Sequence, residues 1–149
     1  ISFLRKVKKL GLLIKLDTNG IKPELIENLI DKGLIDYVAM DIKAPWKKYL
    51  EVTGRKSDLA AIKKSVIILK RGNIPYEFRS TIVPALHTED DILEMARQIK
   101  GADKYFIQQF VPVSKMINSE LVGEKTYSKR RLSELVDEFK DWFGVCKVR

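Results

Sequence analysis

Two short segments of the chain end in charged side chains whose types suit the binding of a small charged molecule. The first reads Leu16-Asp17-Thr18-Asn19-Gly20, and the second reads Met40-Asp41-Ile42-Lys43. Apolar and polar side chains alternate in both, and successive side chains of a strand point to opposite faces of its sheet. A helix can cover the apolar face, but the charged face needs partners, because an unpaired buried charge is costly. The pattern therefore indicates a ligand site.

The two aspartates set an electrostatic condition on that site. Two carboxylates about 5 Å apart repel by roughly 3 kcal/mol at an effective dielectric constant of about 20. Asp17 and Asp41, at the ends of neighbouring strands, therefore need a positive charge between them or a proton on one of them. Lys43, Arg79 or a bound metal ion could supply that charge.

Basic and acidic side chains placed together suit a zwitterionic ligand. Lys43 and Arg79 would bind its carboxylate, while acids or amides would bind its ammonium and hydroxyl groups. Thr18-Asn19-Gly20 predicts a tight turn in which Gly20 adopts a backbone conformation closed to other residues. A plain turn is the alternative for this segment taken by itself.

Other residues with chemical potential favour structural roles. His87 is the single histidine, and beside Thr88 we expect a solvated residue ahead of a helix rather than a base or ligand. Lys15 and Glu77 suggest an internal ion pair, and Cys146 suggests a strand or core position. Trp46, with Tyr49 and Leu50, would cover either a substrate or the rim of the fold. The sequence has no metal-ligand spacing and no nucleophile–histidine pairing.

Strands that alternate with helices must position these side chains. We predict strands at about 12–17, 37–42, 76–83 and 105–110, and helices at about 23–32, 57–70, 88–100 and from 128 onward. Residues 3–10 have the pattern of a helix that precedes the first strand. Ser57 and Thr88 are the expected caps of the second and third of these helices.

This order predicts an α/β fold with right-handed crossovers and a parallel sheet, in a single domain over residues 1–149. A doubly wound sheet would need apolar residues on both faces. Each strand instead keeps one polar set, which favours a partial (β/α) barrel with chemistry at the carboxyl ends of its strands. The polar residues near those ends are Asp17, Asp41, Lys43, Arg79, Thr81, Gln108 and Gln109.

The amino-acid composition limits the classes of protein to which the chain can belong. Of 149 residues, 45% are hydrophobic and 32% are charged, which are globular values, and no apolar run approaches membrane-spanning length. One cysteine excludes an internal disulfide, so we expect a cytoplasmic protein without membrane contact. The abundance of Lys and Glu suggests a heat-adapted source. The net charge of +8 raises nucleic acid as a partner, but the basic residues are scattered beside acids.

Four ordered motifs resemble those of one enzyme family. They are Leu16-Asp17-Thr18-Asn19-Gly20, Met40-Asp41-Ile42-Lys43, Thr53-Gly54 and Arg79-Ser80-Thr81-Ile82-Val83-Pro84. In order and spacing, from Leu10 to Pro112, the chain resembles radical S-adenosylmethionine (SAM) activating enzymes, the relatives of pyruvate formate-lyase activase and of the activase of anaerobic ribonucleotide reductase. The resemblance implies about four βα units of a six-unit partial barrel. It also implies S-adenosylmethionine, a [4Fe-4S] cluster, and a 5′-deoxyadenosyl radical that takes hydrogen from a glycine of a glycyl-radical enzyme.

The resemblance also implies residue roles. Lys43 would contact the methionyl carboxylate of S-adenosylmethionine. Asp17 and Asp41 resemble the pair that holds a monovalent cation near that carboxylate. The remaining cofactor-binding positions implied are Thr18, Asn19, Arg79 and Gln108.

Two family motifs are missing from the chain. Neither the CxxxCxxC loop that ligates the cluster nor a Gly-Gly-Glu segment occurs in the sequence. We therefore expect both upstream of Ile1, so that this chain is the C-terminal part of an oxidoreductase and is inactive alone. The first strand would then lack a neighbour and could associate through its exposed edge.

Two other functions compete with this interpretation. Asp41-x-Lys43 resembles part of the Asp-x-Lys-x-x-Asp motif of orotidine-monophosphate-decarboxylase-like barrels, but Trp46 replaces the last aspartate. A basic RNA-binding module is the non-enzymatic alternative, and it predicts binding that weakens steeply with salt.

Overall fold

One parallel sheet organises the chain. The computed structural model describes residues 1–54, 58–112 and 126–149, and in them a 5-stranded sheet has the order β1-β2-β3-β4-β5. All four neighbouring pairs are parallel. The strands are β1 Lys15–Thr18, β2 Tyr37–Asp41, β3 Tyr76–Ile82, β4 Lys104–Gln109 and β5 Val145–Val148. The predicted parallel α/β architecture is therefore confirmed.

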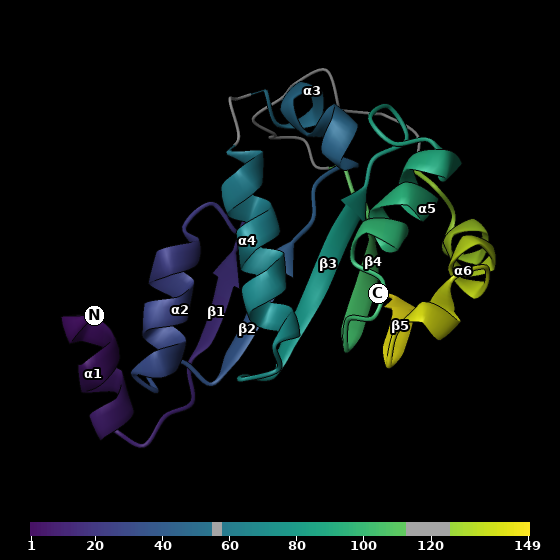
Figure 1. Cartoon of the computed structure of the whole chain (residues 1–149). Helices are drawn as coiled ribbons and strands as arrows, with labels where there is room; N and C mark the ends of the chain where they lie inside the picture. The colour runs from purple at the N-terminus through teal and green to yellow at the C-terminus, as the bar shows by residue number, and fades with distance from the viewer. Residues whose placement is uncertain (55–57, 113–125) are drawn as a thin grey trace.

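Helices follow the strands and gather on one face of the sheet (Figure 1). They are α1 Ser2–Lys9, α2 Pro23–Asp31, α3 Tyr49–Thr53, α4 Leu59–Lys70, α5 Glu89–Gln98 and α6 Lys129–Asp137, with 3-10 turns η1 Trp46–Lys48 and η3 Lys140–Trp142. In Figure 1, α2 and α4 lie in front of the sheet, while α3 lies beyond the carboxyl ends of its strands. None of the helices in the described ranges is long and apolar enough to cross a membrane.

Side-chain caps fix where three helices begin. The Thr88 hydroxyl accepts a hydrogen bond from the Asp91 backbone N–H, and the Asp91 carboxylate accepts one from the Thr88 backbone N–H. These two bonds form the predicted capping box of α5. Ser128 caps α6 by accepting from the backbone of Arg131. The cap of α4 is Asp58; the expected cap, Ser57, lies outside the described residues.

The two faces of the sheet differ as the alternation predicts. One face carries apolar side chains that are fully buried under the helices, including Val38, Met40, Phe78, Ile82, Tyr105 and Ile107. By the strand register, the other face carries Lys15, Asp17, Asp41, Glu77, Arg79, Thr81 and Gln108. We call this second set the polar face. Parallel pairing places Asp41 beside Arg79, and Thr81 beside Gln108.

The structure corrects two predictions at the ends of the sheet. β1 begins at Lys15 rather than at residue 12, and Leu12 and Leu13 before it are 55% and 83% exposed. A fifth strand, β5, pairs with β4 although four strands were predicted. β1 and β5 are therefore the edges of the described sheet.

Candidate functional site

A guanidinium group between two carboxylates forms the centre of the polar face. Arg79 Nη1 lies 2.8 Å from Asp17 Oδ1. Arg79 also donates to Asp41 Oδ1 through Nε at 3.1 Å and through Nη2 at 2.9 Å. Burial alone would lower the pKa of Arg79, but Asp41 and Asp17 outweigh it and raise the pKa. Of the three candidate sources of positive charge between the aspartates, the structure thus places Arg79 there.

Lys43 stands beside this cluster with its side chain exposed. Its Nζ lies 3.8 Å from Asp41 Oδ2, and 46% of its side chain is accessible. An ion pair of that length in water contributes little to stability. The ammonium group can therefore turn from Asp41 to a carboxylate of a ligand at low cost.

A hollow opens next to Lys43 at the carboxyl ends of the strands. It has a volume of about 220 Å³. Asp41, Lys43 and Thr81 give it a polar side, and Val52, Val83 and Leu86 give it an apolar side. A molecule with a charged end and an apolar or aromatic end matches this division.

The amides at the end of β4 point to different places. Gln108 lies on the polar face, where its Oε1 accepts a long hydrogen bond of 3.5 Å from Thr81 Oγ1. Gln109 faces the helices, and its Nε2 donates to the carbonyl of Tyr127 at 2.8 Å. Gln108 therefore extends the polar face, whereas Gln109 holds the segment that leads into α6.

The predicted turn after β1 lies apart from the aspartate–arginine cluster. Thr18 Oγ1 accepts from the Gly20 backbone at 3.1 Å, and Asn19 Oδ1 accepts from the Ile21 backbone at 3.3 Å. Thr18 and Asn19 also line a separate hollow of about 200 Å³ between β1 and α2. Their side chains thus shape the turn rather than join Asp17.

Gly20 is required in this turn for two reasons. Its φ is 78°, and a Cβ built on it would lie 2.1 Å from Met40 Cε. Its carbonyl accepts a 2.7 Å hydrogen bond from the buried Ser65 hydroxyl of α4. The turn that leads away from Asp17 is therefore pressed against the core.

His87 is buried, and the prediction of a solvated residue was wrong. The side chain is 2% exposed, its Nδ1 lies 3.1 Å from the Val83 backbone N–H, and its Nε2 lies 2.9 Å from the Lys43 carbonyl oxygen. Burial lowers the pKa of His87 below 6.5, against the raising effects of the Lys43 carbonyl and Asp91. The imidazole is therefore neutral at pH 7.

A local signal could have placed His87 correctly. It occupies the position before the Thr88 cap, where a side chain often packs against the fourth residue of the helix. That residue is Ile92, which is 1% exposed. A buried residue at position 92 therefore favours burial of the residue before the cap, His87.

Comparison with known proteins places the chain in a family. The model of the radical SAM superfamily matches residues 1–99. The chain belongs to the radical SAM superfamily. The resemblance in the four motifs is therefore confirmed.

Two similar proteins refine the placement of this radical SAM chain. A Methanocaldococcus jannaschii protein described as a glycyl-radical enzyme activating enzyme is 41% identical over 116 residues, covering 75% of this chain and 48% of that protein. The chain spans about half the length of this curated relative. A domain of pyruvate-formate lyase-activating enzyme from Bacteroides vulgatus has a TM-score of 0.73 at 14% identity, over 99% of this chain and 88% of that one. That second likeness shows the fold, a partial α/β barrel.

The described residues of the radical SAM chain do not fit an iron–sulfur cluster. Such clusters are held by several cysteine thiolates. The single cysteine, Cys146, lies in β5, and burial raises its pKa to about 12, so its thiol stays protonated. Within the described ranges, no group of three or more His, Cys, Asp or Glu side chains could hold a metal ion.

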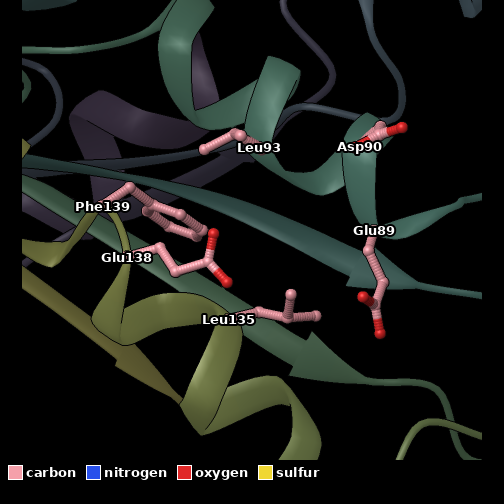
Figure 2. A pocket seen from close by; sticks show the side chains of 6 residues that line it. All are labelled: Glu89, Asp90, Leu93, Leu135, Glu138 and Phe139. Atoms are coloured by element: carbon pink, nitrogen blue, oxygen red, sulfur yellow. The ribbon is translucent and has the colours of Figure 1, made fainter.

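A further hollow lies on the helical side of the radical SAM chain, between α5 and the end of α6 (Figure 2). Its volume is about 90 Å³, and Leu93, Leu135 and Phe139 form its apolar part. Glu89 at its rim is bound to Arg131 Nε at 2.6 Å. This hollow is small and shares no lining residue with the hollow beside Lys43.

Proposed function

We propose that this radical SAM chain binds S-adenosylmethionine at the carboxyl ends of its strands. Lys43 binds the methionyl carboxylate, and the hollow beside it takes the less polar part of the ligand. The observation that carries the proposal is the arrangement of Arg79 between Asp17 and Asp41 with the exposed Lys43 ammonium group beside them. Arg79 compensates the two aspartates, and the exposed Lys43 ammonium group beside them suits the carboxylate of a zwitterion.

The other predicted cofactor-binding residues have supporting positions in this proposal. Gln108 and Thr81 offer hydrogen-bonding groups along the polar face. Thr18 and Asn19 act through the turn that fixes the end of β1. A monovalent cation at Asp17 and Asp41 is the part that the geometry favours least, since Arg79 already supplies a positive charge to both carboxylates.

We further propose that the whole protein activates a glycyl-radical enzyme in the cytoplasm. A [4Fe-4S] cluster, with ligands outside this chain, would supply the electron that cleaves S-adenosylmethionine to a 5′-deoxyadenosyl radical. The chain's own residues bind and orient the cofactor, and the chain alone is inactive. Its 41% identity to the M. jannaschii protein supports this assignment. Association through the unpaired edge of β1 belongs to the same proposal, and sedimentation velocity over a range of concentrations would test it.

The two competing functions find less support. A decarboxylase-like motif needs a carboxylate at the position of Trp46, whose backbone N–H instead donates to Gln98 at 3.2 Å. An RNA-binding surface needs unpaired basic side chains, yet Lys64, Arg71 and Arg131 of the helices pair with glutamates.

Replacement of Lys43 tests the proposed function. Lys43→Ala removes a charged hydrogen-bond donor, so binding of S-adenosylmethionine should weaken by roughly 1.5–3 kcal/mol, which is about 10- to 150-fold. Isothermal titration calorimetry on the chain measures this loss. Lys47→Ala, which removes another exposed positive charge from the same loop, is the matched control and should change affinity by less than about twofold. Equal affinities of wild type and Lys43→Ala would refute the assignment.

A further inference from the structure

We propose that His87 is a positioning residue that, together with Tyr49, fixes the backbone of Lys43 and so sets where its ammonium group lies in the site. What Lys43 binds rests on the proposed function, whereas the anchoring of Lys43 does not. Neither His87 nor Tyr49 belongs to the four motifs of the sequence resemblance.

The chemistry of its two partners assigns the tautomer of His87. A backbone N–H can only donate, so Nδ1 accepts from Val83 at 3.1 Å. A carbonyl oxygen can only accept, so Nε2 carries the proton and donates to Lys43 at 2.9 Å. Both ring nitrogens are thus occupied, although His87 lines the hollow. The residue is not available as a general acid or base. Its Nδ1 bond lies within the loop after β3, and its Nε2 bond joins that loop to the loop after β2.

A second buried ring holds the other side of Lys43. The Lys43 backbone N–H donates to the Tyr49 hydroxyl at 3.3 Å, and Tyr49 is 2% exposed. Both backbone polar groups of Lys43 therefore bond to buried side chains from two different segments. Its own side chain remains exposed. A fixed backbone with a free side chain is the arrangement that aims a long flexible residue at a ligand.

His87 is itself held in place by Tyr127, which precedes α6, and by the start of α5. The Tyr127 hydroxyl donates to the His87 carbonyl at 3.2 Å. Asp91, in the capping box, binds Lys48 Nζ at 2.7 Å and so ties η1 to the same helix. Asp91 and Lys48 are the charged groups that act on the imidazole, with opposite effects on its pKa. A rotation of His87 would break contacts with two segments at once.

Two amide substitutions separate the two bonds of His87. In His87→Asn the amide oxygen can replace Nδ1 toward Val83, but the side chain is too short to reach Lys43. In His87→Gln the longer side chain carries its NH₂ group to the position of Nε2 and keeps the bond to Lys43. Tyr49→Phe removes the second anchor while it preserves the buried ring, and so serves as an independent variant.

The readout is a comparison of two ligands by calorimetry. S-adenosylmethionine carries the methionyl carboxylate, whereas 5′-methylthioadenosine keeps the adenosyl part and lacks it. His87→Asn and Tyr49→Phe should each lower the affinity for S-adenosylmethionine roughly tenfold, the scale of one hydrogen bond. The affinity for methylthioadenosine should stay within about twofold of the wild-type value. His87→Gln should restore most of the loss. In the Lys43→Ala background, His87→Asn should have no further effect on either ligand.

Three outcomes would overturn the inference. The first is an equal loss of affinity for both ligands. The second is a further loss of affinity from His87→Asn in the Lys43→Ala background. The third is an equal affinity for S-adenosylmethionine in His87→Asn and His87→Gln. If the wild type does not bind S-adenosylmethionine, the proposed function fails, and ¹³C relaxation of the Lys43 side chain then decides the anchoring. Greater mobility of Lys43 in His87→Asn than in wild type and His87→Gln supports the anchor, and unchanged mobility refutes it.

Discussion

At the scale of single residues, the Arg79 guanidinium explains why two carboxylates can lie together at the strand ends. Asp17 and Asp41 would repel each other, and Arg79 contacts both. The need for a cation was predictable from the sequence, because both aspartates end neighbouring strands. Which cation fills the place was not predictable, since that depends on the register that sets Arg79 beside Asp41.

Removal of the Arg79 charge should therefore destabilise the fold. Arg79→Gln leaves two carboxylates facing each other in a partly accessible place, so we expect a loss of about 1–2 kcal/mol in the free energy of unfolding, between the values for exposed and buried pairs. Urea unfolding measures it, and about 1 M KCl should reduce the loss by screening. Arg130→Gln, in which an arginine with a 90% exposed side chain is replaced, is the control and should change stability by less than about 0.5 kcal/mol. Similar losses in both variants would contradict the role given to Arg79.

Gly20 offers a second test at this scale. Gly20→Ala places a methyl group against Met40 at a positive φ, so we expect about 2–4 kcal/mol of destabilisation. Gly33→Ala also has a positive φ, 60°, but meets no atom within 4 Å. It should cost only about 1–2 kcal/mol. Denaturant unfolding of both variants isolates the contact with Met40, and equal losses would show that the contact is relieved without cost.

At the scale of elements, the features that depend only on local sequence pattern, such as helix starts, were predicted correctly. The helices α2, α5 and α6 begin where Pro23, Thr88 and Ser128 predict, because caps act within one turn. β5 was predicted only as a strand or core position for Cys146, because Val145–Val148 is short and follows η3 rather than a full helix. Its pairing with β4 depends on long-range packing, including the close approach of Gly144 to the Asp103 carbonyl.

The ion pair predicted for Lys15 and Glu77 is confirmed, and the end of β5 enlarges it. Lys15 Nζ lies 3.5 Å from Glu77, and Arg149 donates to both Glu77 oxygens at 3.1 and 3.2 Å. The Tyr37 hydroxyl adds a hydrogen bond of 3.0 Å. Glu77 is 3% exposed, so two positive charges and one hydroxyl compensate its burial. Arg149 was missing from the prediction because β5 was missing.

This cluster should give the fold a defined acid sensitivity. Burial alone would raise the pKa of Glu77, but Arg149, Tyr37 and Lys15 outweigh it and hold the pKa below 4.5. Such a group stabilises the fold fully above the pKa of the unfolded state, and the effect is lost as pH falls through the folded pKa. Glu77→Gln should therefore lower stability at pH 7 and flatten its decline below about pH 4.5. Unfolding free energies from pH 7 to 3 measure this, and an unaltered slope would contradict it.

At the scale of the whole molecule, one face of the sheet is given to packing and the other to charge. Helices cover the apolar face (Figure 1). By the strand register, the polar face gathers charged and polar side chains from successive strands. The fold class was predictable because the alternation of strand and helix patterns leaves few topologies. The burial of His87 was not, because a bond between two loops depends on the folded whole.

The composition also predicts resistance to heat. Charged networks such as Arg130, Arg131, Glu89 and Glu134 join α5 and α6, and ion pairs lose less to desolvation at high temperature. We expect a thermal unfolding midpoint above about 65 °C, the upper end for mesophilic domains. Circular dichroism on heating measures it. A midpoint of about 45–65 °C would remove the inference of a heat-adapted source.

The strict succession of strands across the sheet bears on how the chain acquires its shape during synthesis. Each strand finds as its neighbour the strand that left the ribosome just before it, so the sheet can grow in the direction of translation. The link between Arg149 and Glu77 spans 72 positions and ties the residue after β5 to β3, which is not a neighbour of β5 in the sheet. It can form only after β5 has been synthesised, so it joins late-made and early-made parts of the sheet.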